Sequence, residues 1–156
     1  MNLEDTQANK FIGSKPSAQD MFDMLCGKFL GEGCFREVFE FRLDPEYVIK
    51  FETRGECFAN ATEWQIWNRV CEWDSDDKNW FAPCWAISPR GDWLIQKRTK
   101  PVATKDLPER VPNCFTDLKD DNWGWLEDRV VCHDYSCHLM VEKAMNGRLK
   151  KADWID

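Results

Sequence analysis

An alternating run at residues 36–42 most constrains the fold of this chain. Within Arg36–Arg42, the apolar Phe39 and Phe41 alternate with the polar Glu40 and Arg42, which is the period of a β-strand with one buried face. The turn signal Asp44-Pro45-Glu46 follows it, and the apolar run Tyr47–Phe51 comes directly afterwards. Strands joined by so short a turn pair antiparallel. We therefore expect an antiparallel sheet around this hairpin.

The rest of the chain adds helices and further strands. Ser17 is a helix N-cap ahead of an apolar stripe that ends at Gly27, and residues 56–72 have helical apolar spacing. Strands are expected at 28–30, 84–87, 93–96, 123–126 and 129–132, with a connector at 101–112 and a last amphipathic helix at 137–145. The order predicts an α+β fold. We expect residues 1–15 to be loosely ordered and residues 16–156 to form a single domain.

Composition excludes several classes of function. A formal charge of −7 argues against a nucleic-acid-binding surface. The chain lacks a run of about 18 apolar residues, so we expect no membrane span. Its first residues, Met1 to Asp5, contain no apolar segment of the kind a secretory signal needs. These features predict a cytoplasmic protein with neither a nucleic acid nor a membrane as its partner.

The chain is rich in cysteine and tryptophan. Eight cysteines without a secretory signal are expected to be reduced thiols that pack as small hydrophobic groups. The segment 132–138 contains cysteine and histidine, but its spacing does not match a common structural zinc site. The nine tryptophans are expected mainly to fill the core.

The heptapeptide 116–122 has the spacing of a phosphoryl-transfer loop. Asp117 is followed by Lys119 and then by Asn122. Phosphoryl transfer needs a carboxylate that orients the attacking hydroxyl and a side-chain oxygen that holds Mg²⁺. A charged stretch of this kind is more often a solvated turn, so its meaning depends on what else the chain contains.

Two upstream motifs suit nucleotide binding. Gly31 and Gly33 lie in a hairpin whose backbone amides can approach phosphates. Lys50 lies within an apolar strand, where its ammonium group needs a partner. Glu63 on the following helix is the first candidate for that partner, and Glu56 is the second.

These motifs, in this order, resemble the protein kinase superfamily. Trp93–Arg98 resembles the strand that leads into the kinase hinge, and Asp134-Tyr135-Ser136 resembles the D-F-G motif, with serine in place of glycine. The combination is similar to the small truncated kinase-like proteins of bacteriophages. Arg36 stands where the kinase pattern has its third loop glycine.

The resemblance implies a role for each candidate residue, with ATP and Mg²⁺ as cofactors. It implies catalytic roles for Lys50, Glu63, Asp117 and Lys119, and metal binding by Asn122 and Asp134. It implies nucleotide contacts at Gly31, Gly33, Phe35, Arg36, Val38, Gln96, Lys97 and Arg98. The expected fold is a kinase-like N-lobe at about 28–97, an antiparallel sheet plus one major helix, with a drastically reduced C-lobe at about 101–156.

Two classes of function follow from this reading. The first is an ATP- and Mg²⁺-dependent phosphotransferase of protein-kinase type, directed at serine or threonine, acting on host proteins in the host cytoplasm if the chain is phage-encoded. The second is a kinase-like binding or inhibitory module that engages a host protein without phosphoryl transfer, because a fold does not fix a function. The apolar face of the C-terminal helix could replace part of the missing lobe or form the seam of a homodimer.

Overall fold

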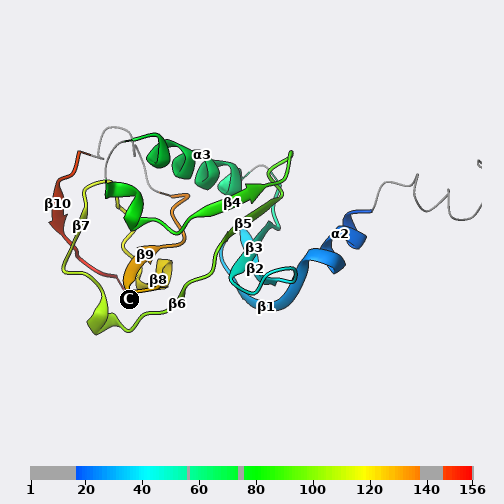
Figure 1. Ribbon diagram of the computed structural model, residues 1–156, viewed down its shortest axis with the longest axis horizontal. Coiled ribbons are helices and arrows are strands. Elements are labelled where there is room, and N and C mark those ends of the chain that lie inside the picture. Colours follow the sequence, from blue (N-terminus) through cyan, green and yellow to red (C-terminus); the bar gives the residue numbers. More distant parts are fainter. Residues whose placement is uncertain (1–16, 56, 74–75, 138–145, 156) are drawn as a thin grey trace, which may run out of the picture.

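A computed structural model describes residues 17–55, 57–73, 76–137 and 146–155. Its main feature is a five-stranded antiparallel sheet with the strand order β1-β2-β3-β5-β4 (Figure 1). The strands are β1 (Cys26–Glu32), β2 (Arg36–Phe41), β3 (Tyr47–Glu52), β4 (Cys84–Ile87) and β5 (Trp93–Lys97). The expected hairpin is confirmed, because β2 and β3 pair antiparallel with Val38 opposite Lys50.

Helix α2 (Ala18–Leu25) covers one face of the sheet. Ser17 caps it through a capping box with Asp20, as the sequence predicts for an N-cap serine. The helix ends at Leu25, and β1 begins at Cys26, one residue before the glycine expected to end the helix. Phe22 packs edge-on against Phe39, with ring centroids 5.1 Å apart. This contact belongs to a small apolar cluster between α2 and the sheet.

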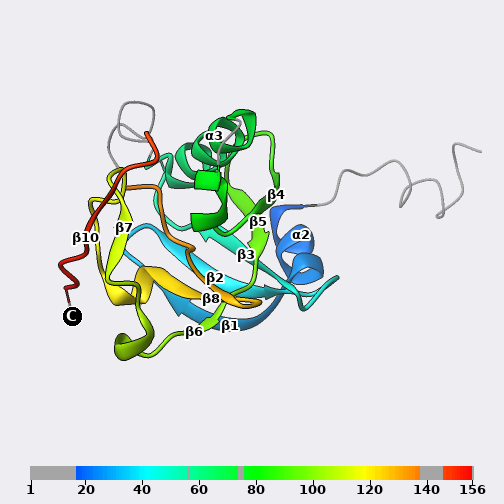
Figure 2. The same cartoon turned by 60° about the vertical axis from the view of Figure 1, so that its left-hand side comes forward.

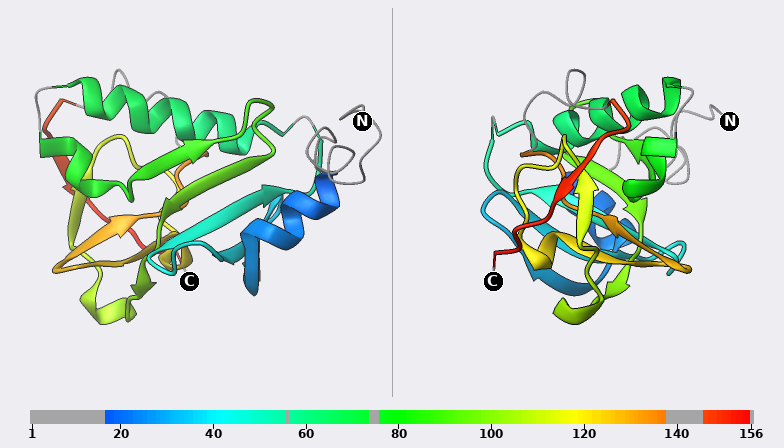
Figure 3. Two further views of the ribbon diagram at one scale, coloured as in Figure 1. Left: turned by 45° about the vertical axis from the view of Figure 1, so that its right-hand side comes forward. Right: turned by 90° about the vertical axis from the view of Figure 1, so that its left-hand side faces the viewer.

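Helix α3 (Ala59–Glu72) packs on the opposite face of the sheet from α2 (Figure 3). It begins three residues later than the sequence predicts. Its N-cap, Phe58, has a left-handed backbone with φ +53° and no side-chain cap. Ile66 and Val70 point from α3 into the larger core cluster, which also contains Leu94 of β5. Residues on alternate positions of β3 and β5 therefore face two different helices.

The second half of the chain forms two smaller sheets beside the large one (Figure 2). The three-stranded sheet contains β6 (Lys100–Pro101), β8 (Trp123–Leu126) and β9 (Arg129–Cys132). The two-stranded sheet pairs β7 (Arg110–Pro112) with β10 (Leu149–Lys151). Short 3₁₀ helices occur at η2 (Asp76–Trp80), η3 (Thr104–Asp106) and η4 (Asp120–Asn122).

The β8–β9 hairpin is confirmed, but the segment expected to be a plain connector contains β7 and η3. The expected helix at 137–145 lies outside the described residues except for Cys137. Strand β10, which the sequence reading did not predict, brings the C-terminal segment against β7.

One apolar core joins the large sheet to the second half of the chain. Its buried members run from Ile66 to Ala152, and several tryptophans pack against it or lie within it. All eight cysteines are free thiols. Burial raises the pKa of Cys84 and Cys114 to about 12, so these thiols stay protonated and pack as apolar groups. Within the described residues, no helix has the length and apolar character needed to cross a membrane.

Candidate functional site

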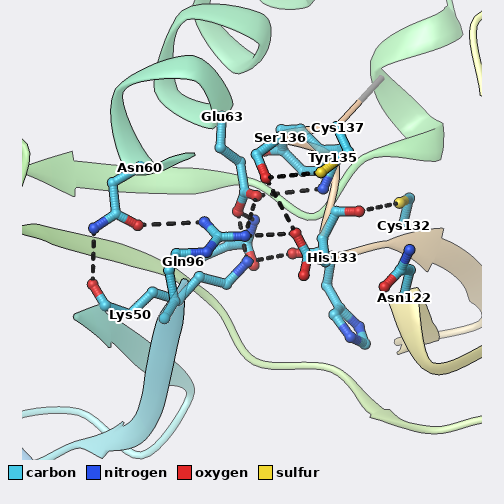
Figure 4. A network of polar contacts seen from close by, with 12 residues as sticks. Lys50, Asn60, Glu63, Gln96, Asn122, Cys132, His133, Tyr135, Ser136 and Cys137 are labelled. Carbon is cyan, nitrogen blue, oxygen red and sulfur yellow. Dashed lines mark hydrogen bonds and ion pairs between the residues drawn. The ribbon is translucent and has the colours of Figure 1, made fainter. Parts of the chain in front are cut away.

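Glu63 of α3 is the centre of a buried polar network (Figure 4). Its side chain is fully buried, and Lys50 Nζ lies 2.5 Å from its Oε1. Gln96 Nε2 donates to the same oxygen at 2.9 Å. The expected approach of Lys50 and Glu63 is therefore confirmed. The second candidate partner, Glu56, lies outside the described residues.

The geometry of the sheet and helix explains how this pair forms. The side chain of Lys50 is on the face of β3 that contacts α3. Asn60, one turn before Glu63, connects the helix to the sheet by hydrogen bonds. Asn60 Nδ2 donates to the carbonyl oxygen of Lys50 at 3.1 Å and to that of Gly91 at 3.0 Å. The sequence reading missed Asn60; the available signal was an asparagine three residues before Glu63, on the same face of an apolar helix.

Arg36 occupies a different place from the one expected for a residue of a glycine-rich loop. Its side chain is only 6% exposed and points into the network rather than outward. Arg36 Nη2 lies 2.9 Å from Glu63 Oε2 and 2.5 Å from Asp134 Oδ1, and Nη1 donates to Asn60. Glu63 thus bridges two cations, and Arg36 joins it to Asp134.

Asp134 lies at the edge of this network. The Lys50 ammonium donates to the carbonyl oxygen of His133, the residue before Asp134. Burial favours the neutral acid, but the nearby Lys50 and Arg36 charges outweigh it and hold the pKa of Asp134 below its usual value. Its carboxylate is therefore ionised at neutral pH, and it is 44% exposed. The next residue, Tyr135, is fully buried and donates its hydroxyl to the Ala82 carbonyl oxygen.

The heptapeptide loop lies next to Asp134. The Asn122 carbonyl oxygen accepts hydrogen bonds from the backbone N–H groups of His133 and Asp134, at 2.8 and 3.3 Å. Asn122 Nδ2 donates to Asp117 Oδ2 at 3.2 Å, and Lys119 Nζ lies 3.9 Å from Asp117 Oδ1. The three predicted residues of the loop are thus brought together, within reach of the segment that carries Asp134.

The C-terminal segment supports the other side of this loop. Ile155 N–H donates to the Leu118 carbonyl oxygen at 2.9 Å, and the Ile155 carbonyl oxygen accepts from Asp120 N–H at 3.4 Å. The Trp154 ring packs edge-on against Trp123, with centroids 5.2 Å apart. The sequence reading missed this support because a single backbone bridge leaves no periodic pattern.

His133 is a further polar residue, half-buried, that the sequence reading did not assign to the site. Its Nε2 lies 2.9 Å from the Asp121 carbonyl oxygen, which can only accept, so Nε2 carries the proton. Nδ1 then accepts from the Thr99 hydroxyl at 2.8 Å. Burial and the Lys50 charge lower the pKa of His133 to about 4, which keeps the ring neutral.

Several residues expected to contact nucleotide do not converge on the network. Gly31 is in β1 and pairs with Val38 of β2, and both are half-buried, whereas Gly33 and Phe35 are exposed in the turn between the two strands. Lys97 and Arg98 point their side chains to Glu46 and Glu40, and their backbone N–H groups donate to the carbonyl oxygens of Pro83 and Glu46. These two backbone N–H groups are therefore engaged within the protein, and nucleotide contact at residues 96–98 stays a prediction.

The donors near Asp134 suit a hard cation. Asp134, Asn122 and Asp117 offer carboxylate and amide oxygens, the ligands that Mg²⁺ prefers. Among the described residues, however, no group of three His, Cys, Asp or Glu side chains is arranged to hold a metal ion. Mg²⁺ in phosphoryl-transfer sites is commonly held by one or two carboxylates together with substrate phosphates. The residues present fit that kind of shared site.

A scan against protein-family models finds no match, and a search of curated proteins finds none either.

Proposed function

We propose that the chain is an ATP- and Mg²⁺-dependent phosphotransferase of protein-kinase type, directed at serine or threonine hydroxyls of a protein, in the cytoplasm. The observation that carries this proposal is the buried Lys50–Glu63 ion pair beside Asp134. These residues come from β3, α3 and the segment after β9, and the proposed reaction needs all three in one place.

The proposal includes a kinase-like fold with the expected division. Residues of about 28–97 form the N-lobe, with its antiparallel sheet and the single helix α3. Residues of about 101–156 form the reduced C-lobe. The pairing of β10 with β7 and the Ile155 bridge support this part of the proposal, because they hold the loop that a larger helical lobe would otherwise support.

Six residues of the site have a defined task in this reaction. Lys50, oriented by Glu63, binds the phosphates of the nucleotide. Asp134 and Asn122 would hold Mg²⁺, which neutralises charge on the phosphates when it is bound. Asp117 orients the acceptor hydroxyl and receives its proton, and Lys119 balances charge on the transferred phosphoryl group. The Asn122–Asp117 hydrogen bond fixes the direction of the Asp117 carboxylate.

A second candidate function has its own support. Arg36 is ion-paired with Asp134, and the N–H groups of Lys97 and Arg98 are used within the protein. Both features suit a kinase-like module that binds a host protein without transferring phosphate.

Phosphate transfer from γ-labelled ATP separates the two functions. The wild type and the matched loop variant Asp121→Asn are expected to label themselves or a protein in host lysate. Asp117→Asn is expected to lower the rate on the order of 100-fold or more. Equal labelling by Asp117→Asn would exclude Asp117 as the base. No labelling by the wild type, together with capture of a host protein, would favour the binding module.

A further inference from the structure

Arg36 is a buried cation to which the proposed reaction assigns no task. It begins β2, and its register opposite β3 places it on the same face of the sheet as Lys50, two positions along the strand. Its guanidinium group is enclosed by Asn60, Glu63 and Asp134. A side chain held in this way cannot be an ordinary exposed member of a phosphate-binding loop.

The guanidinium group competes with a metal ion for Asp134. Arg36 Nη2 lies 2.5 Å from Asp134 Oδ1, on a carboxylate that is partly open to solvent. A divalent cation at that carboxylate would stand beside the positive charges of Arg36 and Lys50. Like charges in a poorly solvated site repel strongly, so a metal ion alone is disfavoured while Arg36 stays in place.

Charge balance also disfavours a nucleotide alone. Arg36 and Lys50 are matched by Glu63 and Asp134. A metal-free triphosphate would add only negative charge, beside Asp134 and near Asp117. A cation and a triphosphate that arrive together avoid both penalties, because Asp134 receives the cation and the guanidinium group is released toward the phosphates.

We propose that Arg36 is a specificity-determining residue that makes the site accept a divalent cation and a nucleotide together and reject either one alone. This inference rests on the proposed function, since it concerns the same site.

The test measures binding rather than activity. Mn²⁺ serves as a paramagnetic probe for the metal site, and free Mn²⁺ is measured by electron paramagnetic resonance in the absence of nucleotide. The variants are Arg36→Met and Arg36→Gln, which lack the charge, and Arg36→Lys, which keeps it. Arg98→Met is the matched control, because Arg98 is also paired with a glutamate but lies outside the network. Circular dichroism identifies the variants that fold.

We expect either neutral variant to bind Mn²⁺ at least about 10-fold more tightly than the wild type, Arg36→Lys and Arg98→Met. We also expect the wild type to bind a non-hydrolysable ATP analogue at least about 10-fold more tightly in Mg²⁺ than in EDTA. Equal Mn²⁺ affinity in the wild type and the neutral variants would overturn the inference. So would equal affinity of the wild type for the analogue with and without Mg²⁺, although the proposed function would then survive.

The absence of analogue binding under every condition would instead refute the proposed function, and with it this role of Arg36. The two failures are therefore distinguishable.

Discussion

Removal of the Glu63 carboxylate is expected to destabilise the protein strongly. Lys50 and Arg36 are 4% and 6% exposed, and both lose their shared partner in Glu63→Ala. Breaking a buried ion pair by removing one partner costs about 3–5 kcal/mol, because a charge is left buried without compensation. Gln96 Nε2 and the Tyr135 N–H group lose an acceptor as well. We therefore expect a loss of about 4 kcal/mol, a large share of the roughly 5–15 kcal/mol that stabilises a domain.

Urea unfolding followed by tryptophan fluorescence measures this loss. With an m-value of about 2 kcal/mol per molar urea, the midpoint is expected to fall by about 2 M. Glu46→Ala is the matched control, because Glu46 is paired with Lys97 at the surface and is 72% exposed. Surface pairs contribute at most about 1 kcal/mol. A midpoint for Glu63→Ala no lower than that of Glu46→Ala would refute the reasoning.

A double variant tests the cause of the loss. Lys50→Met combined with Glu63→Leu removes both charges of one pair and leaves Arg36 with Asp134. Replacing a buried ion pair by apolar side chains of similar size is often neutral. We expect the double variant to be more stable than Glu63→Ala alone. If it is less stable, the unpaired cation is not the main source of the destabilisation.

Three further predictions follow from single contacts. The pKa of His133 is lowered from 6.5 to about 4, so its contribution to the free energy of unfolding is complete above pH 6.5 and is lost as the pH falls toward 4, by at most about 3 kcal/mol. Urea unfolding at several pH values should show a shallower pH dependence of the free energy of unfolding in this window for His133→Gln. A Cβ at Gly124 would lie 2.6 Å from a hydroxyl oxygen, so Gly124→Ala should cost about 1–3 kcal/mol while Gly31→Ala costs little; similar thermal midpoints would contradict this. Ile155→Pro removes the N–H group that donates to the Leu118 carbonyl oxygen, so amide hydrogen exchange in residues 118–120 should become faster. The same variant should lower kcat more than it changes nucleotide affinity. Ile155→Ala, which keeps the N–H group, should have neither effect.

Alternation of polar and apolar residues was enough to predict the large sheet. The hairpin of β2 and β3, the β8–β9 hairpin and both helices follow from local patterns in the chain. Lys50 was identified because burying an ammonium group in an apolar strand costs free energy unless it has a partner, and Glu63 is that partner. The kinase-type function itself stays a prediction.

Arg36 shows where this reasoning stopped short. Its parity in β2 already placed it on the same face as Val38, which lies opposite Lys50. If Arg36 is taken as a loop residue, its side chain is expected to point outward. Its position in β2 instead places the side chain on the face of the sheet that contacts Glu63. The place of β10 and Ile155 could not be found in this way, because a three-residue strand and a single bridge carry no measurable period and depend on contacts with residues far away in the sequence.

The aromatic core and the polar site are one structure. Three polar residues of the site lie close to a buried ring in the chain: Asn122 precedes Trp123, Asp134 precedes Tyr135, and Asp117 is two residues after Phe115. These rings interlock with Phe81, at centroid distances of 4.8 Å for Phe115–Trp123, 4.9 Å for Phe81–Phe115 and 5.0 Å for Phe81–Tyr135. Packed rings hold their backbone neighbours within narrow limits. The packed rings can therefore keep these three polar groups in position, which gives the large aromatic side chains next to the charged segments a structural role.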